Sequence, residues 1–253
     1  MKIPTGIEFL DARIGGIYAG TFNVLLEEVG AGGYEFLMTV IQNNLEKGGK
    51  VFYASLTKTD EMFRREFELV FPKRNVGGIF DKISFRSFAK TYFMRSIVPL
   101  HWFEEKATIL SLKGEKNVLE ELIEFFDSVE SESICVVDSL TDLVRITRSR
   151  LSWNDLVDFL MGLKVLIQRR NLVVYTILTK DIVDQKQQED ILSIADGIIV
   201  FRWKEKGDKM VRTMFVRKLI GVLPLLEKEG IIAYETRIDP ERGFMISSVM
   251  KVI

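Results

Sequence analysis

Short apolar runs alternate with amphipathic stretches along the first 200 residues of the chain. The runs are largely continuous rather than alternating in polarity, which is typical of parallel strands covered on both faces. They predict strands at residues 22–26, 51–56, 83–88, 134–137, 172–178 and 198–201.

Helical patterns fill the intervals between these runs. Residues 118–129 carry apolar side chains at three- and four-residue spacing after Asn117, which is a suitable N-cap. Residues 153–167 do the same after Ser152, and Asp155 is placed for a capping box. Alternating strands and helices predict a wound, mainly parallel sheet.

The pattern changes beyond residue 200. Residues 211–216, 231–237 and 244–249 look like strands joined by tight connections without helices, and residues 239–243 form a good turn. We therefore expect an antiparallel extension of the same sheet at about residues 200–253. Because no Gly/Ser/Pro-rich linker separates the two parts, residues 1–253 are predicted to form a single domain.

Composition removes several classes of protein. The 253 residues are 47% hydrophobic, which excludes disorder, and the net charge of −1 removes a whole-protein argument for nucleic acid. A single Cys and a single His exclude a disulfide scaffold and a multi-histidine metal site. We expect Cys135 to be a core thiol and His101 to be a partly buried structural or interface residue.

The chain shows neither a signal peptide nor an apolar run long enough for a membrane span. These features predict a cytoplasmic protein with no membrane partner. The high Lys and Glu content is typical of thermophilic, including archaeal, proteins.

A Gly-rich turn follows the first predicted strand. Residues 22–26 lead into Gly30, Gly32 and Gly33, after which residues 36–47 have a helical pattern. A strand, a Gly-rich turn and a helix are the context in which a phosphate-binding loop is credible.

The segment before that strand carries fixed residues at the spacing of a known family: Pro4, Thr5, Gly6, Ile7, Leu10, Asp11, Gly15, Gly16, Ile17 and Gly20. In these residues the sequence resembles the RecA-like ATPases, and within them the KaiC-like branch. Residues 136–140 resemble the family's Walker B strand, residues 195–200 its A-D-G strand, and residues 217–221 its late R-K-M-R-G segment. Residues 72–118 carry no landmark. The resemblance implies an α/β, RecA-like P-loop NTPase fold, with a mainly parallel twisted sheet flanked by helices.

The loop itself departs from the family pattern G-x-x-x-x-G-K-[ST]. Glu27 stands at the first Gly, Gly33 at the Lys and Tyr34 at the Ser/Thr, so that only Gly32 is retained. In the family the Lys supplies positive charge to the terminal phosphates and the hydroxyl helps to hold Mg²⁺. Glu27 and Glu28 would place negative charge where a helix N-terminus attracts anions.

Two further parts of the family's ATPase machinery are also changed. Thr57 and Lys58 replace its catalytic Glu pair, and Lys58 has no carboxylate with which to act as a base. Ile220 replaces an Arg that the family offers to a neighbouring subunit, although Lys218 is kept. Asp138 is the one metal-holding carboxylate left, and we interpret it as a polar residue at the end of a buried strand.

The resemblance therefore gives a degenerate nucleotide site with no catalytic residue, no metal site and no cofactor of the ATP/Mg²⁺ type. Its positions are Gly30, Gly32, Gly33, Tyr34 and Asp138. The first hypothesis is a pseudo-ATPase that binds a protein or peptide in a regulatory role, with a homo-oligomer left open. The loop glycines would then offer N–H groups to another ligand, and Tyr34 would close the space.

Two alternatives stay open. One is an ATP-binding ATPase with an unorthodox loop, in which Lys58 or Lys218 supplies the missing charge. The other is a nucleic-acid-associated, recombinase-type paralogue. For the latter, the candidate surface is a basic strip that comprises Arg202, Lys204, Lys206, Lys209, Arg212, Arg217 and Lys218.

Overall fold

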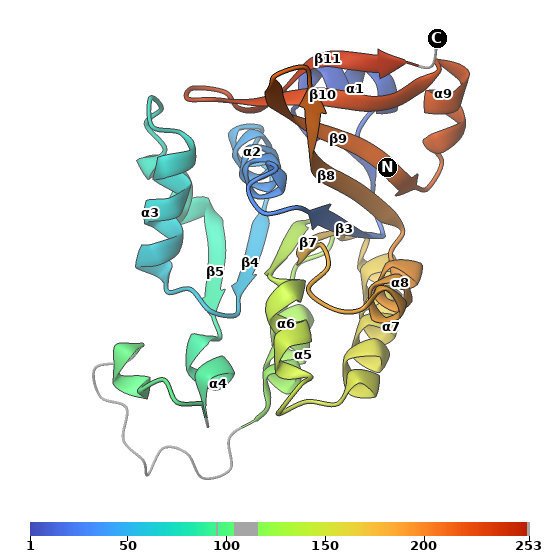
Figure 1. Cartoon of the computed structure of the whole chain (residues 1–253). Helices are drawn as coiled ribbons and strands as arrows, with labels where there is room; N and C mark the ends of the chain where they lie inside the picture. Colours follow the sequence, from blue (N-terminus) through green and yellow to red (C-terminus); the bar gives the residue numbers. More distant parts are fainter. Residues whose placement is uncertain (95, 104–115, 252–253) are drawn as a thin grey trace.

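The computed structural model of the chain describes residues 1–94, 96–103 and 116–251 (Figure 1). Its described part contains a nine-stranded sheet and a short ribbon of Lys2–Ile3 (β1) with Ile17–Tyr18 (β2). The strands of the large sheet are Thr21–Glu27 (β3), Val51–Ser55 (β4), Ile83–Ser87 (β5), Ile134–Asp138 (β6), Val173–Thr179 (β7), Gly197–Lys206 (β8), Lys209–Leu219 (β9), Ile231–Asp239 (β10) and Gly243–Lys251 (β11).

The strand order is β11-β10-β9-β8-β3-β7-β6-β4-β5. Strands β8, β3, β7, β6, β4 and β5 are mutually parallel. Strands β9, β10 and β11 continue the sheet in antiparallel pairing, and they form its orange and red edge in Figure 1. This arrangement confirms the predicted fold class and its antiparallel extension.

Two of the helices begin at the residues that the sequence predicts as N-caps. The predicted N-cap at Asn117 and the predicted capping box at Ser152 are both present, and the structure has a capping box at each position. The helices are Glu8–Ile14 (α1), Gly33–Glu46 (α2), Asp60–Val70 (α3), Ala89–Phe93 (α4), Val118–Ser128 (α5), Leu140–Ile146 (α6), Trp153–Arg170 (α7), Gln185–Ile194 (α8) and Leu223–Lys228 (α9), with 3-10 turns at Gly77–Lys82 (η1) and Leu100–Trp102 (η2).

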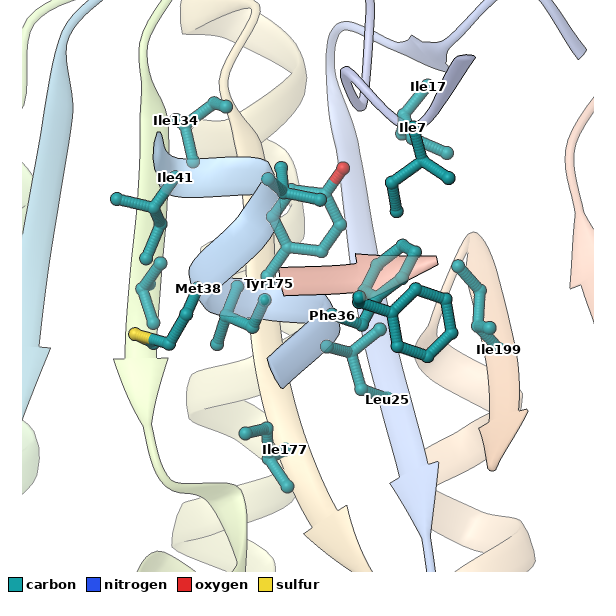
Figure 2. Packing of buried hydrophobic residues seen from close by; sticks show 14 of the residues in the cluster. Ile7, Ile17, Leu25, Phe36, Met38, Ile41, Ile134, Tyr175, Ile177 and Ile199 are labelled. Atoms are coloured by element: carbon teal, nitrogen blue, oxygen red, sulfur yellow. The ribbon is translucent and has the colours of Figure 1, made fainter. Parts of the chain in front are cut away.

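Two hydrophobic clusters cover the two faces of the parallel strands. One face packs against α1, α2 and α3, and Figure 2 shows Phe36 and Ile41 of α2 beside Leu25 and Tyr175 of the sheet. The other face packs against α5, α6, α7 and α8. Alternate residues of β3 serve the two clusters, with Leu25 in the first and Val24 in the second. The continuous apolar runs of the sequence follow from this double burial.

Two expectations need correction. The connection between β9 and β10 is not a tight turn but contains α9, whose Leu226 is buried in the first cluster. This helix has six residues, too few to show a helical period in the sequence. His101 lies in η2 and is exposed rather than partly buried.

Three further features concern Cys135, the segment 72–118 and the length of the helices. Cys135 is fully buried in β6, and this burial raises the pKa of its thiol, as befits a core residue. Within the segment 72–118 that lacks family landmarks, residues 95 and 104–115 lie outside the described residues. Over the part of the chain that is described, no helix combines the length and the apolar character needed to cross a membrane.

Candidate functional site at the Gly-rich loop

The Gly-rich loop, residues 28–32, connects the carboxyl end of β3 to the first turn of α2. Gly30 and Gly32 have φ angles of +76° and +105°, in the left-handed region that glycine adopts without strain. Glu27 pairs with Thr179 across β3 and β7, and Ser55 pairs with Asp138 across β4 and β6. The carboxyl ends of these parallel strands thus meet at one edge of the sheet, beside the loop.

The carboxylate of Glu27 lies against the N-terminus of α2. The backbone N–H of Tyr34 donates a hydrogen bond to Glu27 Oε2 at 3.2 Å. A β-carbon added to Gly33 would lie 2.3 Å from the same oxygen. Glu27 therefore takes the position that a bound anion would take at a helix N-terminus, and residue 33 has room for no side chain while it does so.

The ionised form of Glu27 is unfavourable at this position. Burial, reinforced by the nearby charge of Glu35, raises the pKa of Glu27 to about 7, although hydrogen bonds from the backbone of Tyr34 and Gly33 oppose this rise. The charge of Asp138 acts in the same direction as that of Glu35. The Glu27 carboxyl group is therefore partly protonated near neutral pH.

A second group of side chains, which we call the Lys58 cluster, consists of Lys58, Asp138, Glu66, Tyr34 and Tyr53. Lys58 Nζ lies 2.9 Å from Asp138 Oδ2 and 2.7 Å from Glu66 Oε2. The Tyr53 hydroxyl donates to Asp138 Oδ2 and the Tyr34 hydroxyl to Glu66 Oε2, both at 2.8 Å. The ammonium group also lies 4.5 Å from the centre of the Tyr34 ring. The cluster joins β4, β6, α2 and α3 by charge and hydrogen bonds.

Lys58 neutralises Asp138 inside the protein. The exposed fractions of the two side chains are 18% and 8%. Burial alone would lower the pKa of Lys58, but the charge of Asp138 and the hydrogen bond with Glu66 outweigh it and raise the pKa. The carboxylate that resembles a Walker B Asp therefore has a counter-ion of its own, supplied from the position of the family's catalytic Glu.

Strands β8 and β9 hold the outer side of the Gly-rich loop. Glu28 accepts hydrogen bonds from Lys180 and from the backbone N–H of Trp203, both at 2.9 Å. The Trp203 indole donates to the carbonyl of Val29 at 3.1 Å, and Arg212 Nε donates to the carbonyl of Gly30 at 2.9 Å. Glu27 therefore holds the start of α2 on the inner side of the loop, and Trp203 and Arg212 hold the loop backbone on its outer side.

The other predicted residues lie away from this site. Lys218 pairs with Ile198 near the amino end of β8, and its ammonium donates to the carbonyls of Ser193 and Ala195. It therefore does not supply charge to the loop of its own chain. Ile220 is exposed beside it.

The basic strip is partly neutralised by contacts within the chain. Arg217 forms a two-bonded pair with Glu189, and Lys206 pairs with Glu235. Arg212 is engaged with the loop, as described above. These contacts reduce the positive charge that the strip offers to a nucleic acid.

Sequence reasoning identified Lys58, Tyr34 and Asp138 but missed Glu66 and Tyr53. Glu66 lies midway along α3, where the sequence pattern does not distinguish it from the other acidic residues of that helix. Nothing in the pattern of β4 distinguishes Tyr53 from a core aromatic residue. Across the described residues, no group of three or more His, Cys, Asp or Glu side chains is placed to hold a metal ion.

Comparison of the sequence with protein-family models and with curated proteins gives no match. Among solved structures, the chain is similar to the flagellar accessory protein FlaH from Methanocaldococcus jannaschii, with 16% identity, a TM-score of 0.67 and 98% of each chain covered. It is also similar to the KaiC-like protein PH0186 from Pyrococcus horikoshii, with 19% identity, a TM-score of 0.68, and 98% of this chain and 99% of that one covered. At these identities the likeness establishes the architecture: the chain has the RecA-like fold of these KaiC-like structures.

Proposed function

We propose that this chain is a non-catalytic protein of RecA-like fold that acts by binding a protein or peptide partner in a regulatory role. One observation supports the proposal: two contacts within the chain occupy the edge of the sheet beside the Gly-rich loop. Glu27 Oε2 accepts the Tyr34 N–H at the start of α2, and Lys58 Nζ lies 2.9 Å from Asp138.

A triphosphate at this loop would meet strong opposition. It would have to displace the Glu27 carboxylate and would add its charges beside Glu35, whereas the charge of Glu28 is paired with that of Lys180. One like-charge contact at about 5 Å and an effective dielectric constant near 20 costs about 3 kcal/mol. A penalty of that size weakens binding by more than about a hundredfold. Lys58, the one nearby Lys of the cluster, is already paired with two carboxylates.

Two further points concern the role of the chain and its compartment. One structural neighbour, FlaH, is a flagellar accessory protein, and we propose an accessory role of this general kind for the present chain. The free and buried Cys135 supports a reducing compartment, so we propose that the chain acts in the cytoplasm.

Isothermal titration calorimetry with Mg²⁺-ATP and Mg²⁺-ADP tests the proposal. We expect no binding up to about 1 mM nucleotide. The matched gain-of-function variant is Glu27→Gly/Gly33→Lys/Tyr34→Thr, which rebuilds the family loop pattern and should bind at least about tenfold more tightly. Gly33→Lys alone is the control, because its β-carbon would meet Glu27 Oε2 at 2.3 Å. A micromolar dissociation constant of either nucleotide for the unaltered chain would contradict the proposal.

That same result would favour the ATP-binding alternative with Lys58 as the donor, because Lys58 lies at the correct edge of the sheet. The two readings then separate on Lys58→Met. If Lys58 contacts phosphate, the substitution abolishes the measured binding. If Lys58 only neutralises Asp138 and Glu66, the substitution leaves the measured nucleotide binding in place.

A further inference from the structure

A cavity of about 540 Å³ opens beside the Lys58 cluster, between the start of α2, α3 and the turn from β10 to β11. The backbone N–H of Lys73 donates to the carbonyl of Pro240 at 3.2 Å, which holds that turn against the segment after α3. The apolar wall of the cavity consists of Leu69, Val70, Pro72, Ile238 and Pro240. Leu69 is 68% exposed, so this wall offers apolar surface that the chain itself leaves uncovered.

The polar side of the cavity carries an excess of negative charge. Its charged lining residues are Glu35, Glu66 and Lys58, and Asp138 lies directly behind Lys58. Lys58 is shared between Glu66 and Asp138. Within the described part of the chain, the carboxylate of Glu35 has no ion-pair or hydrogen-bond partner. Two carboxylates thus share one ammonium group, and a third carboxylate, that of Glu35, lines the same cavity.

The positive end of α2 does not reverse this balance. The N–H of Tyr34 in its first turn already donates to Glu27. The edge of the sheet that holds a polyanion in a phosphate-binding loop is therefore, in this chain, a place that attracts a cation. The acidic groups are not placed to hold a metal ion, so the fitting ligand is an organic cation.

We propose that this cavity binds an Arg or Lys side chain that an apolar, extended segment of a partner protein inserts into it. The inference rests on the proposed function, since it requires a site without nucleotide. The aliphatic stem of such a side chain lies along Leu69 and Ile238, and its charged head reaches Glu35 and Glu66. Apolar neighbours in the segment cover Val70 and Pro240. Arg fits best, because its planar head can bond both carboxylates at once.

The test is an NMR titration of the ¹⁵N-labelled full chain with acetyl-Leu-Arg-Leu amide. The matched probe is acetyl-Leu-citrulline-Leu amide, which keeps the shape of Arg and removes its charge. We expect the Arg probe to shift the amides of Glu35, Glu66 and Leu69 and to bind about tenfold more tightly than the citrulline probe. Equal binding of the two probes would overturn the proposal, as would shifts confined to other surfaces.

Variants locate the interaction. Glu35→Gln should weaken binding of the Arg probe about fivefold, because it removes the unpaired carboxylate. Glu68→Gln is the control, since it makes the same change at an exposed position of α3 that does not line the cavity. Spermidine tests a free cation without an apolar flank, and we expect it to bind more weakly than the Arg probe. Binding of spermidine as tight as that of the peptide would overturn the assignment to a protein segment.

Addition of Mg²⁺-ATP to the same sample separates this inference from the proposed function. Shifts at Gly30 and Gly32 caused by nucleotide would contradict the proposed function. Absence of both nucleotide and Arg-probe binding would overturn this inference alone.

Discussion

Two carboxylates in this chain, Asp11 and Glu27, form the same kind of bond in two regions that differ in almost everything else. Asp11 accepts hydrogen bonds from the backbone N–H and the hydroxyl of Thr5 and from the N–H of Gly6, at 2.7 to 2.9 Å. Glu27 accepts the N–H of Tyr34 at 3.2 Å. The first carboxylate folds the lead-in segment, whereas the second lies against the N-terminus of α2 beside the Gly-rich loop.

The comparison explains which parts of the family pattern this sequence keeps. Residues of the lead-in are fixed by backbone geometry: a β-carbon on Gly6 would lie 2.2 Å from the Asn43 side chain, and one on Gly16 would lie 2.5 Å from the carbonyl of Ile3. Both glycines also have positive φ angles. In the Gly-rich loop, Glu27, Gly33 and Tyr34 stand where the family pattern has Gly, Lys and Ser/Thr. The positions of the lead-in that match the family pattern are therefore ones that the backbone of this fold requires.

The largest expected effect falls on the lead-in. Asp11→Ala removes three hydrogen bonds to a carboxylate and leaves the Thr5 donors without a partner, while Thr5 itself is fully buried. We expect a loss of about 4 kcal/mol in the free energy of unfolding, measured by urea denaturation. Asp11→Asn keeps one oxygen acceptor and should lose about half as much. A loss below about 1 kcal/mol for Asp11→Ala would show that the lead-in is not fixed by this carboxylate.

The next effect concerns the Lys58 cluster. Lys58→Met removes the counter-ion of Asp138, whose side chain is 8% exposed, so a buried charge is left without compensation. We expect a loss of about 3 kcal/mol in the free energy of unfolding. Adding Asp138→Asn to Lys58→Met should restore part of it, because the amide carries no charge to neutralise.

A double-mutant cycle over Lys58 and Asp138 measures this coupling. Additive effects of the two substitutions would mean that the pair is not an internal substitute for a bound metal and nucleotide. Glu61→Gln is a suitable control, because Glu61 lies on α3 but is exposed outside the cluster.

The sequence predicted the parts of the fold that depend on periodicity. The apolar runs placed β3, β4, β6 and β7 within one or two residues, and the N-cap at Asn117 and the capping box at Ser152 formed as expected. The six-residue α9 gave no periodic signal and was missed. Strands β8 and β9 extend beyond their predicted ranges toward Lys206 and Lys209, because this exposed tip is held by cross-strand pairing and not by burial.

For the candidate site, the sequence could predict only which groups of the family pattern are replaced. The family pattern showed which groups were missing at Glu27, Gly33 and Lys58. It did not show that Glu27 turns inward to the first turn of α2, or that Lys58 meets Glu66 from the next helix. Those contacts depend on how elements distant in sequence pack together, which no local pattern encodes.

The smallest effect tests the Gly-rich loop through pH. The pKa of Glu27 is about 7 in the folded chain against 4.5 as its ordinary value. Between these two values the folded state holds a proton that the unfolded state has lost, so stability falls as the pH rises through this window and levels off above about 7. Glu27→Gln removes this dependence while its amide oxygen still accepts the Tyr34 N–H. We therefore expect Glu27→Gln to gain about 2 kcal/mol relative to the unaltered chain when the pH is changed from about 5 to about 8, by urea denaturation at both values.

The gain is a difference between two chains that share every other titrating group, so it isolates Glu27. If Glu27→Gln and the unaltered chain lose stability in parallel, the Glu27 carboxylate is not confined against α2. The contrast between a carboxylate that folds the chain and one that occupies its ligand site would then fail.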